Sequence, residues 1–404
     1  MRADSHPTPP LAGDGTSLSA ILRALDTARA LRPDVPLALA TLMSVEGSSY
    51  RQPGARLLVD SEQRVLAGAI SGGCLEGDVA ARAADVCATN KAVLLRYDLR
   101  EDLETIWGFG SGCDGMAHIL LEPLSNDRWL RNAHAAMMRR SYSMLTTTFL
   151  AAPESGRLGH HSLIEDMTID GTDEFDPVAT AFRTGMPFVA THLIDGNTYG
   201  ELAEPLNAPV ALHIIGAGTS AEAFATIAVA MGWQVTVVDH RESLLQALRL
   251  PTAATRLVRR AEDGLGELPT DGRTAIALLT HMFEVDVAWL NALLSQPAAY
   301  IGVLGSRNRA ARLVSQLMEN GVVITEAMQQ RLFAPIGLDL GGETPESIAL
   351  AGIAEIEAVL NARTGGFLRT RQHPIHTRTP VPMIAGEGVA VTIEECAIPQ
   401  NQRE

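Results

Sequence analysis

The stretch Ala211-Leu212-His213-Ile214-Ile215-Gly216-Ala217-Gly218-Thr219-Ser220-Ala221 decides the fold of the C-terminal half of the chain. Its apolar start predicts a buried strand, and the GxGxxA pattern that follows predicts a tight turn into a helix. A second apolar run ends at Asp239, which stands 23 residues after Gly216, close to the spacing of a ribose-binding carboxylate. A glycine turn at a helix N-terminus lets a diphosphate approach the backbone. This half of the chain is therefore expected to be a Rossmann-like domain.

Strands and helices alternate after this stretch. Strands are expected at residues 234–239, 274–279 and 300–304, and helices at 216–231, 243–250, 285–294, 307–318 and 343–360. Strands that alternate with helices of this length indicate βαβ units and a parallel sheet. The last helix opens with Thr344-Pro345, which is typical of an N-cap residue followed by a first-turn proline.

Six residues of this half are candidate contacts for a bound nucleotide. They are Gly216, Gly218, Asp239, Arg241, His281 and Arg307. Arg241 can meet a ribose 2′-phosphate, so NAD and NADP both stay open. His281 is a proton donor, a phosphate contact or a loop residue without a role, and Arg307 either binds phosphate or forms a surface ion pair. Because the fold also exists as a scaffold without nucleotide, binding is a hypothesis here.

In the N-terminal half, the segment Ser71-Gly72-Gly73-Cys74-Leu75-Glu76-Gly77-Asp78 combines glycines, a cysteine and two carboxylates. Gly72 and Gly73 let a ligand approach the backbone closely. Cys74 precedes a helix expected to run to Thr89, and a helix N-terminus favours the thiolate, which acts as a nucleophile or a soft ligand. Glu76 belongs to the same candidate site. The alternative is a buried cysteine beside a structural turn.

A second glycine-rich segment, Gly108-Phe109-Gly110-Ser111-Gly112-Cys113-Asp114-Gly115, also carries a cysteine. Gly112 and Cys113 are therefore candidate ligand contacts. Together the two segments can cradle a phosphorylated, sulfur-containing or metal-bearing ligand with backbone N–H groups and thiolates. Arg56 adds positive charge nearby, although a strand arginine that caps a carboxylate is the alternative. Cys87 falls in a helical pattern and is expected in the core.

The composition argues against several classes of protein. A chain of 404 residues is expected to form two or three domains. A formal net charge of −15 and an aromatic content of 4% argue against nucleic acid and anionic membranes as partners. Four cysteines without CxxC spacing predict reduced thiols. The N-terminus lacks the basic and apolar regions of a signal peptide, so a cytoplasmic protein is expected.

Five segments are expected along the chain. Residues 1–16 form a disordered lead, 17–124 an N-terminal α/β domain, 125–206 an intermediate subdomain or extension, 207–365 the Rossmann-like domain and 366–404 a flexible tail. Glu122-Pro123-Leu124 and Glu204-Pro205-Leu206 mark the two ends of the intermediate segment in the same way.

Several motifs follow one another in an order that resembles the XdhC/CoxI family. They are Glu46-Gly47-Ser48-Ser49, Pro53-Gly54-Ala55-Arg56, Ser71-Gly72-Gly73-Cys74-Leu75-Glu76-Gly77, Trp107-Gly108-Phe109-Gly110, Gly216-Ala217-Gly218, Asp239-His240-Arg241, Gly305-Ser306-Arg307 and Ala334-Pro335-Ile336-Gly337. The resemblance covers roughly residues 18–124 and 202–362. It implies an α/β fold, with an N-terminal α/β XdhC-type domain followed by a C-terminal Rossmann-like domain with a parallel sheet.

The resemblance also implies a chaperone-like function, because these proteins are xanthine dehydrogenase accessory proteins. Such proteins bind molybdenum cofactor (molybdopterin bearing Mo), protect it and promote its sulfuration with sulfur from a cysteine desulfurase. They then insert it into an apo xanthine dehydrogenase-type molybdoenzyme. Carried over by position, Cys74 is the cofactor-contacting thiol and a candidate Mo contact. Whether its sulfur ligates Mo, relays sulfur or only positions the pterin stays open, as does a homodimer.

Two functional hypotheses follow. In the first, the chain is a maturation factor without turnover of its own. In the second, it is an NAD(P)-dependent oxidoreductase that acts on a small metabolite, with His281 or Cys74 as an acid or redox group. The glycine–cysteine segments lie outside the Rossmann half, and the sequence has no evident Tyr-x-x-x-Lys motif for hydride transfer. The sequence therefore favours the first hypothesis.

Overall fold

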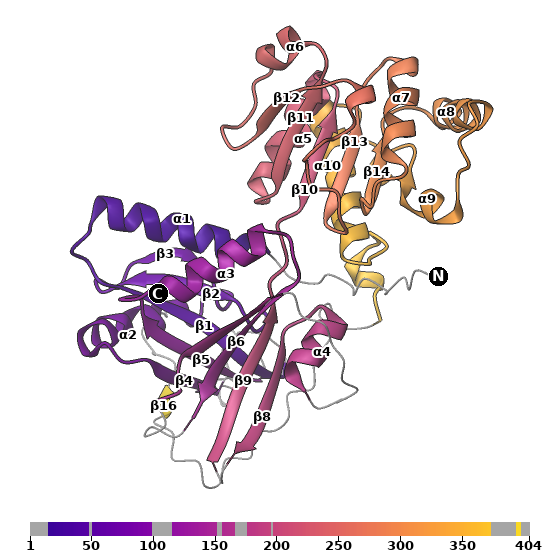
Figure 1. Ribbon diagram of the computed structural model, residues 1–404. Helices are drawn as coiled ribbons and strands as arrows, with labels where there is room; N and C mark the ends of the chain where they lie inside the picture. The colour runs from indigo at the N-terminus through magenta and orange to yellow at the C-terminus, as the bar shows by residue number, and fades with distance from the viewer. Residues whose placement is uncertain are drawn as a thin grey trace. The chain divides into compact units, whose positions relative to one another are not determined.

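The computed structural model describes residues 15–47, 51–98, 115–151, 156–165, 176–194, 197–372 and 393–396. These residues fall into two compact units, shown in Figure 1. The N-terminal unit comprises residues 15–208 with 393–396, and the Rossmann unit comprises residues 209–372. Within the described ranges, no helix combines the length and the apolar character that a membrane span needs.

The Rossmann unit is a six-stranded parallel sheet with helices between its strands (Figure 1). Its strands are β10 (Ala211–Ile215), β11 (Gln234–Asp239), β12 (Thr255–Val258), β13 (Thr274–Leu278), β14 (Tyr300–Val303) and β15 (Leu332–Phe333). Its α-helices are α5 (Thr219–Ala230), α6 (Glu242–Ala247), α7 (Phe283–Leu293), α8 (Arg307–Glu319), α9 (Glu326–Arg331) and α10 (Pro345–Leu360). The strand order β12-β11-β10-β13-β14-β15 is that of a dinucleotide-binding fold, so the expected parallel sheet is confirmed.

The strands of this sheet are buried because helices cover both faces. β10 and β13 are fully buried along their length, as their continuous apolar runs predict. Against one face, α10 packs closely on α5: a Cβ added at Gly352 would lie 2.5 Å from the ring of Phe224, so only glycine permits this approach. At its start, α10 is capped by Thr344, whose hydroxyl accepts the Ser347 N–H at 3.2 Å, with Pro345 next. The predicted cap is therefore confirmed.

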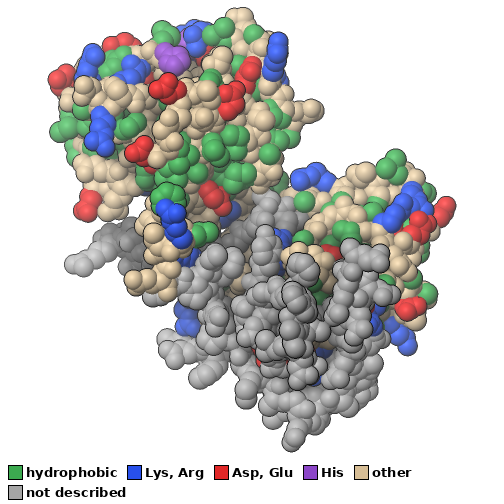
Figure 2. All heavy atoms as spheres, turned by 180° about the vertical axis from the view of Figure 1, so that it is seen from behind, with side chains coloured by type: hydrophobic (Ala, Val, Ile, Leu, Met, Phe, Trp, Pro, Cys, Tyr) green, Lys and Arg blue, Asp and Glu red, His purple; other side chains and the backbone are tan. Residues whose placement is uncertain are grey.

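One side of the Rossmann unit carries charged side chains of both signs (Figure 2). On the side seen in Figure 2, acidic and basic side chains are interspersed with one another and with apolar ones. Charges on this side of the unit therefore offset one another locally.

The N-terminal unit contains two sheets and four helices among its described residues. The helices are α1 (Gly15–Leu31), α2 (Glu76–Thr89), α3 (Arg128–Met138) and α4 (Pro177–Thr184). The first sheet has the order β16-β4-β5-β1-β2-β3, with β1 (Leu37–Gly47), β2 (Arg56–Asp60), β3 (Val65–Gly68), β4 (Val93–Asp98), β5 (Gly115–Pro123) and β16 (Ile393–Cys396). The second has the order β7-β6-β9-β8, with β6 (Ser143–Leu150), β7 (His160–Glu165), β8 (Phe188–Ile194) and β9 (Asn197–Pro205).

One hydrophobic cluster joins the two sheets of this unit. It contains Met43, Leu94 and Leu120 of the first sheet and Phe149, Leu150, Val189 and Leu202 of the second. A second cluster places α1 against α3, which lie side by side in Figure 1. Residues 125–206, expected as an intermediate subdomain or extension, thus share one core with residues 15–124.

The last described segment returns to the first sheet. Residues 393–396 form β16, which pairs in parallel with β4, Ile393 opposite Leu94 and Cys396 opposite Tyr97. These four residues of the expected flexible tail are thus a strand, because β4 offers them an open row of backbone N–H and C=O groups. The other strand pairs of this unit are antiparallel among the residues described.

Candidate functional site

The first candidate site lies at the carboxyl edge of the parallel sheet, where β10 and β13 are neighbours and the strand order reverses. Gly216 has a φ of +114°, and a Cβ there would lie 3.0 Å from the Thr280 backbone nitrogen. The loop can therefore approach Thr280 this closely only because residue 216 is glycine. Gly218 is the N-cap of α5, and a Cβ there would meet nothing within 4 Å. Open space thus adjoins the helix N-terminus, which fits an anionic diphosphate.

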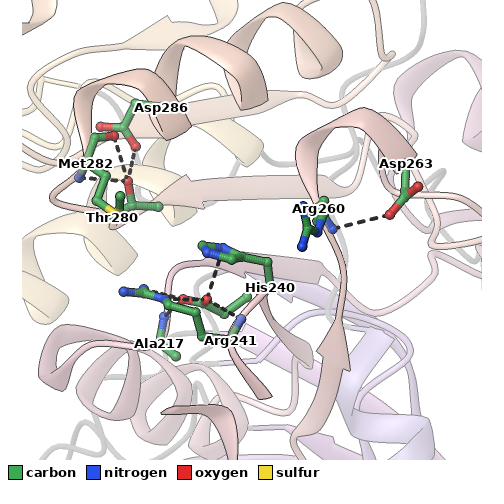
Figure 3. Close-up of polar contacts among 9 residues, drawn as sticks. Ala217, His240, Arg241, Arg260, Asp263, Thr280, Met282 and Asp286 are labelled. Carbon is green, nitrogen blue, oxygen red and sulfur yellow. Dashed lines mark hydrogen bonds and ion pairs between the residues drawn. The ribbon is translucent and has the colours of Figure 1, made fainter. Parts of the chain in front are cut away.

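Asp239, at the end of β11, is held by the glycine loop and by its own neighbour. Figure 3 labels Ala217, His240 and Arg241, whose nitrogens contact its carboxylate. Its Oδ2 accepts the Ala217 N–H at 2.8 Å and Arg241 Nη2 at 2.8 Å. Its Oδ1 accepts the Arg241 backbone N–H and Arg241 Nε, both at 2.9 Å. His240 Nδ1 lies 3.4 Å from the same Oδ1. Two carboxylate oxygens accept about four hydrogen bonds, so this carboxylate is saturated from within the chain.

These contacts keep Asp239 ionised. The side chain is only 2% exposed, and burial by itself raises the pKa of a carboxyl group. The hydrogen bonds from Arg241 and from the Ala217 N–H outweigh burial and lower the pKa of Asp239 to about 2. Ribose hydroxyls can reach this carboxylate only by displacing Arg241, whose side chain is 40% exposed.

A buried carboxylate, Asp286, lies beside the same edge of the sheet (Figure 3). The Thr280 hydroxyl donates to its Oδ1 at 2.5 Å, and Arg309 Nη2 donates to its Oδ2 at 2.7 Å. Burial raises the pKa of Asp286, and the hydrogen bonds from Thr280 and Arg309 oppose this rise. A Cβ at Gly305 would lie 2.7 Å from Arg309 Cδ, so the glycine makes room for the arginine. This group, which sequence reasoning missed, fixes Arg309 next to the loop after β14.

The other predicted contacts of this half lie exposed. His281 follows Thr280, and Arg307 begins α8 after the N-cap Ser306. Of the six predicted contacts, the structure brings together Gly216 and Gly218 of the glycine turn with Asp239 and Arg241. The Ala217 N–H, which was not predicted, links the turn to Asp239. The signal for Arg309 was present in the sequence, two residues after the predicted Arg307, but its buried partner Asp286 lies 23 residues away along the chain.

The second candidate site is the loop Ser71–Asp78. The side chain of Glu76 folds back onto the backbone of this loop. The Glu76 carboxylate accepts the backbone N–H groups of Ile70 at 3.1 Å, Ser71 at 2.8 Å and Leu75 at 3.2 Å, and also the Ser71 hydroxyl. Ser71 Oγ in turn accepts the Gly73 N–H at 3.1 Å. Burial acts to raise the pKa of Glu76, but these hydrogen bonds lower it. Glu76, predicted as a cofactor contact, thus binds the loop backbone.

Cys74 is the thiol that this loop carries. Its side chain is partly exposed, and Gly72 and Gly73 beside it are exposed. Gly73 has a φ of +114°, and a Cβ there would meet nothing within 4 Å. The loop therefore leaves open space at Gly73, the residue before Cys74, and Cys74 stands two residues before α2 begins.

The remaining cysteines and Arg56 differ from Cys74. Cys87 packs against the core, and burial followed by the charge of Asp60 raises the pKa of its thiol. Gly112 and Cys113 lie outside the described residues. Arg56, predicted as a ligand contact, has a side chain only 2% exposed and binds both carboxylate oxygens of Glu204, at 2.9 and 2.6 Å. Arg56 therefore caps a carboxylate from a strand, because the partly buried Glu204 of the second sheet lies beside it.

Comparison with known proteins matches both halves of the chain. The XdhC and CoxI family model matches residues 30–98, and the XdhC Rossmann domain model matches residues 212–356. A Bacillus subtilis (strain 168) protein, named as a probable xanthine dehydrogenase subunit, is 29% identical over 318 residues, which cover 79% of this chain and 91% of that protein. The Escherichia coli (strain K12) "Uncharacterized protein YqeB" is 35% identical over 186 residues, 45% of this chain and 34% of that protein.

A solved structure shares the fold. The crystal structure of a xanthine dehydrogenase from Bacillus halodurans aligns with a TM-score of 0.66 at 24% identity, covering 86% of this chain and 97% of that one. The two family models together match more than half of the chain and include both the Ser71–Asp78 loop and the Gly216 turn. The chain belongs to the XdhC and CoxI family.

Proposed function

We propose that this chain matures a molybdoenzyme of the xanthine dehydrogenase type by binding molybdenum cofactor at the Ser71–Asp78 loop. Family membership and the Bacillus subtilis relative, whose name refers to xanthine dehydrogenase, support the maturation role. One observation carries the site: a partly exposed Cys74 follows Gly73, which adjoins open space, in a loop whose backbone Glu76 binds. In this proposal the chain is a carrier without turnover of its own.

Each residue of the loop then has a separate role. Glu76 binds three backbone N–H groups and so orients the loop. Gly72 and Gly73 expose the backbone to an anionic pterin phosphate, and Cys74 offers a soft sulfur ligand. The cofactor, when bound, supplies the metal centre and its sulfur ligand. In this proposal a cysteine desulfurase provides the sulfur and the apo-enzyme accepts the loaded cofactor.

A matched pair of variants tests the site. Wild type, Cys74→Ser and Cys87→Ser are purified from a host that makes the cofactor, and bound pterin and molybdenum are measured by mass analysis. Cys74→Ser is expected to lose the cofactor while keeping the thermal midpoint of wild type, because the side chain is partly exposed. Cys87→Ser is expected to keep it. Equal cofactor content in wild type and Cys74→Ser would refute the assignment.

We further propose that the Rossmann unit binds NADP in preference to NAD. The open space at Gly218 suits a diphosphate at the start of α5. Asp239 is saturated by the Ala217 N–H and by Arg241, so a free ribose 2′-hydroxyl finds no acceptor there, whereas a 2′-phosphate finds the exposed side of the Arg241 guanidinium. Calorimetric titration is expected to give a lower Kd for NADP. Arg241→Ala is expected to abolish the preference for NADP, because the 2′-phosphate loses its cation and Asp239 becomes free to accept the ribose 2′-hydroxyl of NAD. Tighter binding of NAD would contradict the proposal.

The oxidoreductase hypothesis is separated from the carrier hypothesis by one assay. Oxidation of NADPH is followed in the absence of any molybdoenzyme. Turnover with a small metabolite that Cys74→Ser abolishes would favour the oxidoreductase, whereas nucleotide binding without turnover would favour the carrier.

A further inference from the structure

The N-terminal unit contains the same arrangement of helices and strands twice. Six elements of the segment 15–124 have a counterpart in the segment 128–206: α1 with α3, β1 with β6, β2 with β7, α2 with α4, β4 with β8 and β5 with β9. The strand β3 has no counterpart among the described residues of the second segment. Within the sheets, the order β4-β5-β1-β2 of the first segment equals the order β8-β9-β6-β7 of the second. We call these segments copy one and copy two.

The strand registers of the two copies agree residue by residue. The corresponding pairs are Leu37–Asp60 and Ser143–Glu165, Ala38–Pro123 and Met144–Pro205, and Val93–Leu121 and Phe188–Ala203. The pairing register of both copies also shifts at the corresponding place. In copy one Met43 has no partner on β5, and in copy two Phe149 has no partner on β9. A bulge at the same position in two sheets is difficult to explain by coincidence, because a bulge is a specific local device.

Backbone contacts repeat at the same positions. The Leu124 N–H donates to the Leu37 carbonyl, and the Leu206 N–H donates to the Ser143 carbonyl, both at 2.8 Å. These leucines end the two Glu-Pro-Leu segments of the sequence. Gly54 and Gly159 also correspond: each has a positive φ, 91° and 76°, and donates its N–H to the carbonyl before the bulge, that of Leu42 or Thr148.

The contacts between the copies are reciprocal. In the shared register Arg56 corresponds to His161, since they pair with Thr41 and Thr147, and Glu122 corresponds to Glu204. Arg56 of copy one binds Glu204 of copy two, and His161 of copy two lies 2.9 Å from Glu122 of copy one. In a two-fold symmetric dimer, residue i of one subunit contacts residue j of the other, and residue j of the first contacts residue i of the second. The two ion pairs follow this pattern.

The apolar contacts between the sheets follow the same symmetry. The cluster that joins the sheets contains three corresponding pairs, which are Met43 and Phe149, Leu94 and Val189, and Leu120 and Leu202. Each copy therefore buries the same face against the other.

We infer that residues 15–206 are two fused copies of one α/β unit that pack as an intramolecular dimer, in which copy two occupies the dimerisation surface of copy one. The copies differ in their connections. Residues 99–114 connect β4 to β5, whereas residues 195 and 196 connect β8 to β9. The Cys74 loop follows β3 in copy one, and α4 of copy two starts with Asp176-Pro177 instead. Copy two thus has the supporting role, and copy one carries the thiol loop. This inference is independent of the proposed function.

The symmetry predicts how the long connection of copy one can be closed. Asp98 pairs with Met116 as Leu193 pairs with Thr198, so residues 195 and 196, which connect β8 to β9 in copy two, correspond in the chain to residues 100–114 of copy one. In the full chain, residues 100–114 are replaced by Asp-Gly, and a control replaces residues 99–114 by one alanine. The Asp-Gly variant is expected to keep the thermal midpoint and the hydrogen-exchange protection of β4 and β5. The alanine control is expected to lose both, because one residue cannot close a hairpin. Unfolding of the Asp-Gly variant, or equal stability of the two, would overturn the inference.

An exchange across the interface gives a second test that needs no deletion. His161→Arg places at this position the residue that copy one has, opposite Glu122. Arginine also retains stacking on Trp129, whose ring now stacks on His161 at 3.6 Å. The midpoint of His161→Arg is expected above that of His161→Ala, in which the Thr147 hydroxyl loses the same hydrogen bond. A His161→Arg variant less stable than His161→Ala would contradict the equivalence of the two ion pairs.

Discussion

The two glycine turns of this chain are held by carboxylates in opposite ways. Glu76 binds the turn from within the same loop, six residues or fewer from each N–H group that it accepts. Asp239 accepts a hydrogen bond from its turn although it lies on another strand, and its other hydrogen bonds come from Arg241. The first arrangement leaves a soft sulfur group exposed, and the second leaves a guanidinium exposed. The group exposed at the first turn, the Cys74 sulfur, therefore belongs to the turn itself. The group exposed at the second turn, the Arg241 guanidinium, follows the neighbouring strand β11.

The largest loss of stability is expected when the Asp239 carboxylate, which holds the Rossmann turn, is removed. Asp239→Ala leaves the Ala217 N–H and the Arg241 guanidinium without their acceptor. Loss of hydrogen bonds to a buried charge destabilises by about 2–3 kcal/mol. Urea unfolding measures the change in the free energy of unfolding, with Glu242→Ala, at the start of α6, as the control. A change equal to that of the control would show that Asp239 does not hold the turn.

The same carboxylate should make stability depend on acid. The pKa of Asp239 is about 2 in the folded chain, below its ordinary value of 3.8, so its contribution is complete above pH 3.8 and is lost as the pH falls toward 2. A depression of this size corresponds to about 2 kcal/mol. Unfolding free energies measured between pH 5 and pH 2 are expected to fall less steeply in Asp239→Asn than in wild type. Parallel curves would refute the assignment.

Substitution by alanine should cost less stability at Gly73 than at Gly216. Both Gly73 and Gly216 have a φ of +114°, but only Gly216 has backbone within 3.0 Å of an added Cβ. Gly73→Ala is expected to cost about 1 kcal/mol from backbone strain, and Gly216→Ala about 2 kcal/mol or more from strain plus contact. Gly218→Ala, where space is open and φ is negative, is the control. Equal costs at Gly73 and Gly216 would mean that the approach to Thr280 is not tight.

The smallest effect on stability is expected for the carboxylate of the thiol loop. Glu76→Gln retains one carbonyl acceptor for the backbone N–H groups and loses the charge, so a loss of about 1 kcal/mol is expected. The effect on Cys74 should exceed the effect on stability, because the loop is no longer held in one shape. Alkylation of Cys74, followed by mass analysis of that peptide, is expected to change in rate. An unchanged rate would show that Glu76 does not orient the thiol.

Much of the fold could be predicted from the sequence because its signals are local. The buried strands around Gly216, the Thr344 cap and the helix after Cys74 follow from runs and spacings within about a dozen residues. The long-range contacts could not be predicted in this way. Asp286 with Arg309, and Arg56 with Glu204, join residues on different elements, and no local pattern relates the two members of either pair. The two Glu-Pro-Leu segments marked the ends of the intermediate region, but the register that makes them counterparts exists only in the paired sheets.

The strand β16 has a consequence for the order in which the chain is made. The first sheet begins with residues synthesised early, but its edge strand follows the whole Rossmann unit in the sequence. During translation, β4 therefore emerges as an open sheet edge and stays so until residues 393–396 leave the ribosome. An open edge is a template for pairing with another chain. Nascent chains stalled after the Rossmann unit would accordingly be prone to associate, and pairing of residues 393–396 with β4 would prevent that association.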